Sequence, residues 1–310
     1  MPAAGRLRLV GRIPGMGAQI LDGASLAAQI RRQVAADVAE LTAGGHAPML
    51  AAVLVGDSEA CLLYANSQHR HCQKVGISYQ LHHLPAGTDQ ASLAAVIDRL
   101  NADPAVTGIV LLLPLPEGMA AHEMQYRIDP YKDAEGVNPA NIGLVFYGSP
   151  IIAPCTALAV MELVRLTQRP LEGALAVVVG QGAIVGKPVT MFLLQQNATV
   201  VGCHKHTRNL PEHTRRADLL IVAAGQPQLV GPEMVKPGAV VIDVGINRLS
   251  VTGPDGQPAS KVVGDVRFDE VAEVAGAITP VPGGVGPVTV AILLRNTVEA
   301  VRKQLARTSS

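Results

Sequence analysis

The feature that most constrains the fold of this chain is a regular alternation between short apolar segments and longer segments with helical periodicity. Residues 49–55 and 108–113 are continuous apolar runs, whereas residues 19–45, 59–75 and 91–101 carry apolar side chains every three or four positions. Continuous apolar runs are typical of strands that are buried on both faces, and their alternation with helices is typical of parallel sheets. The pattern therefore predicts an α/β fold with a helix-covered parallel sheet.

The same alternation resumes after a Gly- and Pro-rich junction at residues 148–156. Four more short, β-branched segments are predicted strands, at 176–179, 199–201, 219–223 and 239–244. A final helix is predicted over residues 288–305, after a Pro- and Gly-rich segment at 278–287. The 310 residues are enough for two domains of ordinary size, so we predict one on each side of the junction.

The composition excludes several classes of function. Apolar residues make up 48% of the chain, and 25 basic residues balance 25 acidic ones, so no positive excess is available to neutralise nucleic-acid phosphates. Aromatic residues are only 3%, and every apolar run is shorter than the ~18 residues that a membrane span needs. The four cysteines form no CxxC pair, which argues against disulfides and zinc and favours a reducing, cytoplasmic location. We expect neither nucleic acid nor membrane as a partner.

The first eighteen residues differ from the rest of the chain. Arg6, Arg8 and Arg12 lie among Gly and Pro, and the first acidic residue is Asp22. The apolar patch between the arginines is too short for a secretory signal, and organelle-targeting peptides are usually longer and Ser-rich. Residues 1–18 are therefore predicted to be a flexible tail.

A glycine-rich turn follows the predicted strand at 176–179. Gly180, Gln181, Gly182 and Gly186 give the spacing GxGxxxG ahead of an apolar helix. Such a turn lets the backbone approach a dinucleotide pyrophosphate, which the helix N-terminus stabilises with free N–H groups. The motif alone is weak, because a tight strand–helix turn without a ligand has the same pattern.

The next strand end favours NADP over NAD. NAD-specific folds carry an acidic residue about 20 positions after the glycines. Here residues 203–208 are basic, and Lys205, with His206 or Arg208, is positioned for a 2′-phosphate. A solvated basic loop remains the alternative. His204 and His206 have no evident third partner, so no metal site is expected.

Several motifs together resemble one known family. They are Leu54-Val55-Gly56-Asp57, Leu113-Pro114-Leu115-Pro116, Pro154-Cys155-Thr156, Ile184-Val185-Gly186-Lys187-Pro188, Asp243-Val244-Gly245-Ile246-Asn247, Gly264-Asp265-Val266 and the run 279–287. In this order they resemble the bifunctional methylenetetrahydrofolate dehydrogenase/methenyltetrahydrofolate cyclohydrolase (FolD) family. The resemblance covers about residues 19–300.

The resemblance implies a two-domain α/β architecture. Residues 19–150 and 278–310 would form a folate-binding catalytic domain, to which the C-terminal helix returns, and residues 151–277 a Rossmann-type NADP-binding domain. Family members usually form homodimers and bind a reduced folate, 5,10-methylenetetrahydrofolate. The resemblance assigns cofactor contacts to Gly180, Gln181, Gly182, Lys205 and Ile246, and substrate contacts to Tyr64, Glu135, Pro282, Gly283 and Gly284.

The resemblance assigns the catalytic positions to Tyr64, Gln68, Leu112 and Glu135, and at the last three the chain is identified as a divergent member. The family's catalytic Lys, four residues after Tyr64, is Gln68 here, its partner Gln is Leu112, and an Asp is Glu135. An amide cannot relay a proton as a tuned Lys can, whereas hydride transfer needs mainly alignment of the reactants. We therefore predict an NADP-dependent methylenetetrahydrofolate dehydrogenase whose cyclohydrolase activity is weak or lost.

Three alternatives stay open at this point. The chain could be an ordinary bifunctional dehydrogenase/cyclohydrolase that tolerates these changes. It could be a dehydrogenase for a different pterin one-carbon carrier, or a catalytically silent relative that binds NADP.

Overall fold

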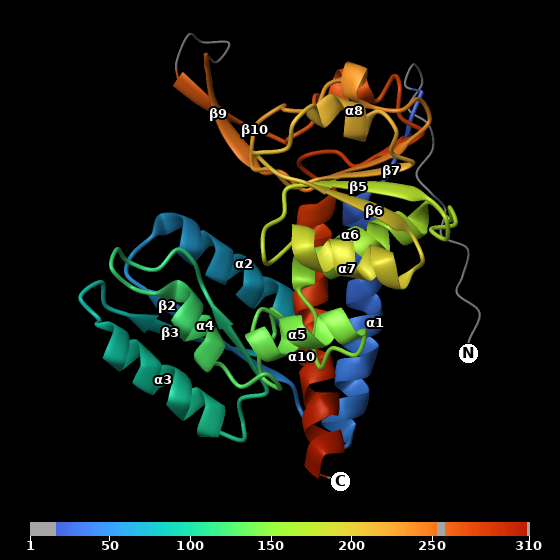
Figure 1. The fold of residues 1–310 in the computed structure, drawn as a ribbon. Coiled ribbons are helices and arrows are strands. Elements are labelled where there is room, and N and C mark those ends of the chain that lie inside the picture. The colour runs from blue at the N-terminus through green and yellow to red at the C-terminus, as the bar shows by residue number, and fades with distance from the viewer. Residues whose placement is uncertain (1–16, 253–257, 309–310) are drawn as a thin grey trace. The chain divides into compact units, whose positions relative to one another are not determined.

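The computed structural model describes residues 17–252 and 258–308, which form two compact units. One unit comprises the described residues up to Ala27 together with Thr156–Thr289, and the other comprises Ala28–Cys155 together with the chain from Val290 onward. We name them the six-stranded unit and the three-stranded unit after their main sheets (Figure 1). The division falls inside helices α1 (Gly23–Ala43) and α10 (Val285–Thr308).

The three-stranded unit is built around a parallel sheet with the order β3-β2-β4. Apart from the ends of α1 and α10, its elements are β2 (Met49–Val55), α2 (Glu59–Val75), β3 (Ser78–Leu84), α3 (Gln90–Ala102), β4 (Gly108–Leu111), α4 (Ala121–Arg127) and α5 (Pro139–Tyr147). Alternate residues of β2 pack with α3 and α4 in one apolar core. Helix α2 begins where Ser58 accepts a hydrogen bond from the Cys61 N–H, and ends at Gly76 in the left-handed conformation.

The C-terminal helix α10 is anchored to the three-stranded unit by polar side chains. Gln304 donates hydrogen bonds to the carbonyls of Thr107 and Tyr131, at 2.8 and 2.9 Å. Arg302 pairs with Asp37 of α1 at 3.1 Å. These contacts confirm that the C-terminal helix returns to the N-terminal part of the chain.

The six-stranded unit has a parallel sheet with the order β1-β11-β8-β7-β5-β6. Its strands are β1 (Gln19–Ile20), β5 (Leu175–Val179), β6 (Thr199–Cys203), β7 (Leu219–Val222), β8 (Val240–Asp243) and β11 (Ala277–Ile278), joined by helices α6 (Cys155–Leu166), α7 (Gly186–Gln195), α8 (Leu210–Thr214), η1 (Pro232–Met234) and α9 (Phe268–Val271). A separate antiparallel hairpin is formed by β9 (Asn247–Thr252) and β10 (Pro258–Val263). Side chains of β5, β7 and β8 form the centre of the apolar core.

The two-domain α/β fold with parallel sheets is confirmed, with differences at the ends of the units. Residues 19–27 and 278–289, which the sequence analysis assigned to the folate-binding domain, group by contacts with the six-stranded unit. The final helix begins at Val285, before the predicted start at 288. The tail predicted for residues 1–18 lies outside the described residues, except for Gly17 and Ala18. Every described helix is too short or too polar to cross a bilayer.

Candidate functional site

The glycine turn of the six-stranded unit has a conformation that requires glycine. Gly180 directly follows β5 with φ of 98°, and a Cβ there would overlap the carbonyl oxygen of Ala223. At Gly186, the first residue of α7, a Cβ would overlap the carbonyl oxygen of Gly180. The turn therefore brings the end of β5 and the start of α7 into backbone contact.

A pocket of about 430 Å³, named here the turn pocket, lies beyond this turn. Its lining includes Gly180, Gln181, Gly182, His204 and Lys205. None of the described residues that line it is an Asp or a Glu. A Cβ at Gly182 would meet no atom within 4 Å, so the backbone there faces open space. The structure thus brings the predicted pyrophosphate-binding turn and the predicted 2′-phosphate-binding Lys together.

Two of the polar side chains beside the turn pocket are held by local hydrogen bonds. Gln181 turns back toward its own strand, where its Nε2 donates to the Val178 carbonyl at 3.1 Å. The backbone N–H of His206 donates to His204 Nδ1 at 3.2 Å. Within residues 17–252 and 258–308, no three His, Cys, Asp or Glu side chains gather as a metal site would need.

The Pro-Gly segment lines a second pocket of the six-stranded unit, the Pro-Gly pocket, of about 150 Å³. Pro282, Gly283, Gly284 and Ile246 all line it. Ile246, which is 68% exposed, also lines a third pocket of about 330 Å³ that includes Gly182. Gly182 thus lines both the turn pocket and the third pocket, and Ile246 lines both the third pocket and the Pro-Gly pocket. Through these two residues, the pockets with the five predicted cofactor contacts adjoin the pocket with the three predicted folate contacts of this unit.

Two buried carboxylates hold the loops around these pockets. Asp243 accepts hydrogen bonds from the backbone of Gly245 at 2.9 Å, and of Asp265 and Val266 at 3.0 Å each. Asp265 accepts from the N–H groups of Ala224 and Gly225. The sequence analysis quoted both acids only as parts of motifs and missed this supporting role.

In the three-stranded unit, helix α2 carries Tyr64 and Gln68 one turn apart. Tyr64 is 40% exposed, whereas Gln68 is only 1% exposed. The Tyr79 hydroxyl of β3 donates to Gln68 Oε1 at 3.2 Å. Tyr79 was not predicted, because its contact with α2 depends on how the strand packs rather than on any sequence spacing.

Titratable groups gather around Tyr64. Burial raises the pKa of Tyr64 to about 12, and Glu135 and Cys155 contribute to this rise. Burial also raises the pKa of Glu135 from 4.5 to about 8, and the neighbouring Asp133 adds to the rise. At neutral pH both the Tyr64 hydroxyl and most of the Glu135 carboxyl are therefore protonated. The structure thus groups Tyr64, Gln68 and Glu135.

The turn that carries Glu135 is fixed by its buried neighbour. Asp133 accepts hydrogen bonds from the backbone of Gly136 and Asn138 and from the side chain of Asn141, at 2.7 to 3.0 Å. Burial raises the pKa of Asp133 while these donors oppose the rise. The carboxylate therefore orders the backbone on which Glu135 stands.

Leu112, another of the predicted catalytic positions, is a buried apolar residue. It follows β4, and its backbone N–H donates to the Val53 carbonyl at 2.9 Å. An isobutyl side chain can neither donate nor accept a hydrogen bond. Leu112 therefore contributes shape, not polar chemistry, to this part of the unit.

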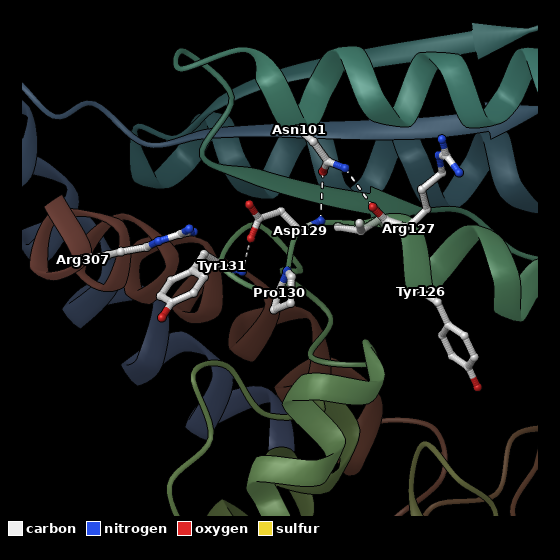
Figure 2. A pocket seen from close by; sticks show the side chains of 8 residues that line it. Asn101, Tyr126, Arg127, Asp129, Pro130, Tyr131 and Arg307 are labelled. Atoms are coloured by element: carbon white, nitrogen blue, oxygen red, sulfur yellow. Dashed lines mark hydrogen bonds between the residues drawn. The ribbon is translucent and has the colours of Figure 1, made fainter.

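A separate pocket of the three-stranded unit contains none of the predicted site residues. It has a volume of about 580 Å³ and is lined by Asn101, Tyr126, Arg127, Ile128, Asp129, Pro130, Tyr131 and Arg307 (Figure 2). Asn101 bonds to the backbone of Arg127 and Asp129, and Arg307 lies over the Tyr131 ring. Polar groups of the residues that line this pocket therefore already bind to one another.

Comparisons with known proteins cover both units. Residues 21–135 match the catalytic domain of tetrahydrofolate dehydrogenase/cyclohydrolase, and residues 154–305 match the NAD(P)-binding domain of the same family. The bifunctional protein FolD of Moorella thermoacetica is 48% identical over 288 residues, which span 93% of this chain and 100% of that protein. FolD of Bordetella petrii is 50% identical over 287 residues, or 93% and 95% of the two chains.

Solved structures give the same picture. The bifunctional enzyme FolD from Campylobacter jejuni has a TM-score of 0.87 at 41% identity, and covers 93% of this chain and 99% of its own. The methylenetetrahydrofolate dehydrogenase-cyclohydrolase of Trypanosoma brucei, solved with NADP cofactor and inhibitor, has a TM-score of 0.86 at 36% identity, with 93% and 98% covered.

Proposed function

The chain belongs to the tetrahydrofolate dehydrogenase/cyclohydrolase family, and from this premise we propose that it oxidises 5,10-methylenetetrahydrofolate to 5,10-methenyltetrahydrofolate with NADP. The observation that carries the proposal is the turn pocket, with its open glycine backbone, its Lys205 and no acidic residue among its described lining. The NAD(P)-binding domain match and the NADP complex of the Trypanosoma brucei relative support the choice of cofactor.

The residues of the turn pocket fit NADP. The backbone at Gly182 faces open space, and the ten-residue helix α7 begins at Gly186, where the turn ends, and a helix N-terminus at this place suits a pyrophosphate. Lys205 offers a positive charge to a 2′-phosphate, whereas a carboxylate for the two ribose hydroxyls of NAD is missing from the described lining. When bound, the cofactor supplies the acceptor for hydride from the one-carbon bridge.

The residues around Tyr64 fit a reduced folate. The half-exposed Tyr64 ring offers a flat surface with a neutral hydroxyl, and the protonated Glu135 carboxyl can both donate and accept hydrogen bonds. Neutral polar groups of this kind suit the ring edge of a pterin. The roles of Pro282, Gly283 and Gly284 as substrate contacts remain predictions. Homodimer formation and a cytoplasmic location are also predictions.

The relatives support a second reaction, in which the same protein hydrolyses 5,10-methenyltetrahydrofolate to 10-formyltetrahydrofolate. Relatives with about half their residues identical to this chain carry the name bifunctional protein FolD. The ordinary bifunctional enzyme, first considered as an alternative, is therefore better supported than a dehydrogenase with weakened hydrolysis.

One specific observation keeps the dehydrogenase alone as a second candidate. Gln68 and Leu112 occupy the positions at which the resemblance implies Lys and its partner Gln, and neither side chain titrates. The groups nearby that do titrate, Tyr64 and Glu135, both have raised pKa values. Proton transfer during water attack would then lack a basic side chain at Gln68, whereas hydride transfer requires none.

One assay tests both reactions. Purified protein is mixed with 5,10-methylenetetrahydrofolate and NADP, and NADPH and methenyltetrahydrofolate are followed separately against an enzyme-free blank. NADPH formation with accelerated methenyl loss supports the bifunctional enzyme. NADPH formation with methenyl loss no faster than the blank supports the dehydrogenase alone, and Gln68→Lys should then accelerate hydrolysis. If no NADPH forms with NADP, and no NADH forms in a parallel assay with NAD, the proposed oxidation is contradicted.

A further inference from the structure

Gln68 is a buried amide of which only one half has a partner. Its Oε1 accepts a hydrogen bond from the Tyr79 hydroxyl at 3.2 Å. Its Nε2 is buried and has no hydrogen-bond partner among the described residues. Buried polar groups are nearly always paired, because an unpaired N–H gives up its hydrogen bonds to water. The free Nε2 therefore points to an acceptor that a ligand brings.

The Tyr79 hydroxyl hydrogen-bonds to the oxygen end of the Gln68 amide, which leaves the nitrogen end free within the part of the chain that the structure describes. Burial raises the pKa of Tyr79 well above 10, and the neighbouring Cys72 and Tyr64 add to the rise, so its hydroxyl keeps its proton. A hydroxyl that donates to the amide selects the oxygen as its acceptor. The Tyr79 ring itself is held against His69, with 5.3 Å between ring centroids and 12° between ring planes.

The free end of the amide belongs to the group of side chains around Tyr64. The Gln68 side chain lowers the pKa of Tyr64, which places the amide close to the Tyr64 hydroxyl, although burial and Glu135 outweigh this effect. The amide is uncharged, and the titrating groups of this cluster, Tyr79, Tyr64 and Glu135, are mostly protonated at neutral pH. A neutral acceptor suits this setting better than an anion.

We propose that Tyr79 is a positioning residue that orients the Gln68 amide, so that Nε2 donates a hydrogen bond to a carbonyl oxygen or ring nitrogen of the bound folate. The inference rests on the proposed function, because it requires a reduced folate beside Tyr64. It assigns Gln68 a binding role, as a neutral donor, that is independent of any proton transfer.

Tyr79→Phe tests the proposal, because it removes the hydroxyl and keeps the ring that stacks on His69. The amide can then rotate, and the KM for 5,10-methylenetetrahydrofolate should rise about 5- to 30-fold, the effect of losing one well-placed hydrogen bond. The kcat and the KM for NADP should stay within about twofold of wild type, since hydride transfer does not use this amide. Tyr147→Phe is the matched control, because the Tyr147 side chain is 82% exposed in the same unit.

A double-mutant cycle separates positioning from a general structural effect. Gln68→Met removes the amide at similar size and should raise the folate KM by a similar factor. In that background Tyr79→Phe should add less than about twofold, because no amide remains to be oriented. A merely structural Tyr79 would instead add the same factor in both backgrounds, and that result would overturn the proposal.

The outcomes also distinguish this inference from the proposed function. A wild-type protein without dehydrogenase activity contradicts the proposed function itself. An active wild type in which Tyr79→Phe leaves the folate KM unchanged, or raises the KM for NADP equally, overturns only the inference. Should Tyr79→Phe fail to fold, the KM of Gln68→Met decides, and an unchanged value then overturns the donor role.

Discussion

The Asp265 backbone N–H donates to the Asp243 carboxylate at 3.0 Å, which places two buried acidic residues side by side in the six-stranded unit. Burial raises the pKa of Asp243 to about 6, and Asp265 adds to the rise, although three backbone donors oppose it. Gly245 and Gly264 are both pressed against this pair, where any side chain would overlap a carboxylate oxygen. The loops that line the predicted ligand pockets thus depend on a carboxyl group that titrates near pH 6.

This raised pKa predicts a pH dependence of stability. An acid whose pKa is higher in the folded than in the unfolded state stabilises the fold when it is protonated. For Asp243 this stabilisation is fully present below the unfolded-state pKa of 3.8, and it is lost as the pH rises through the folded-state pKa of about 6. The free energy of unfolding of wild type, relative to Asp243→Asn, should therefore increase as the pH falls from about 8 to about 5. Urea titrations at several pH values measure this difference, and a constant or decreasing difference would contradict it.

Asp218→Asn provides the control for that experiment. Its hydrogen bond from Lys236 lowers the pKa of Asp218, so its contribution is present above pH 3.8 and is lost only as the pH falls below that value. The difference between wild type and Asp218→Asn should therefore stay flat over the range in which the Asp243 difference changes.

The glycine turn predicts two distinct phenotypes from the same substitution. Gly180→Ala places a Cβ against the Ala223 carbonyl at a positive φ, and should destabilise the six-stranded unit by roughly 1–3 kcal/mol. Gly182→Ala meets no atom within 4 Å, so it should leave the melting temperature unchanged and raise the KM for NADP. Thermal melting without ligand and NADP kinetics separate the two, and equal melting losses would refute this distinction.

Most of the strands that were predicted correctly from the sequence have both faces buried, whereas β6 is only partly buried and was predicted from its β-branched residues. Residues of β2, β4, β7 and β8 are almost all buried, so their sequences are continuous apolar runs. β3 was missed because it is an edge strand that pairs only with β2, is mostly not buried, and loses its polar–apolar alternation at His82 and His83. β1 and β11 have two residues each, too few for any periodicity.

The candidate site divides in a similar way. Gly180 and Lys205 were found because their chemistry depends on local spacing along one strand, turn and helix. The roles of Tyr79 and of Asp265 depend on contacts between segments that are distant in sequence, such as the hydrogen bonds from Ala224 and Gly225 to Asp265. No periodicity or motif spacing records such contacts.

The raised pKa of Glu135 predicts how folate binding varies with pH. If the protonated carboxyl binds the pterin, the folate KM of wild type should rise above a pH of about 8, where Glu135 ionises. Glu135→Gln resembles the protonated acid and does not titrate, so its folate KM should stay level across this range. Steady-state kinetics from about pH 6 to 9.5 test this, and a parallel rise in the variant would assign the titration to another group.

Lys205 is predicted to determine the preference for NADP over NAD. Lys205→Ala removes the positive charge from the lining of the turn pocket and should raise the KM for NADP about 10- to 100-fold, as loss of a charge-assisted hydrogen bond to a phosphate does. The KM for NAD in the same variant is the internal control and should change less than about twofold, because NAD has no 2′-phosphate. Equal increases for both cofactors would show that Lys205 supports the pocket generally, and would leave the cofactor preference to another residue.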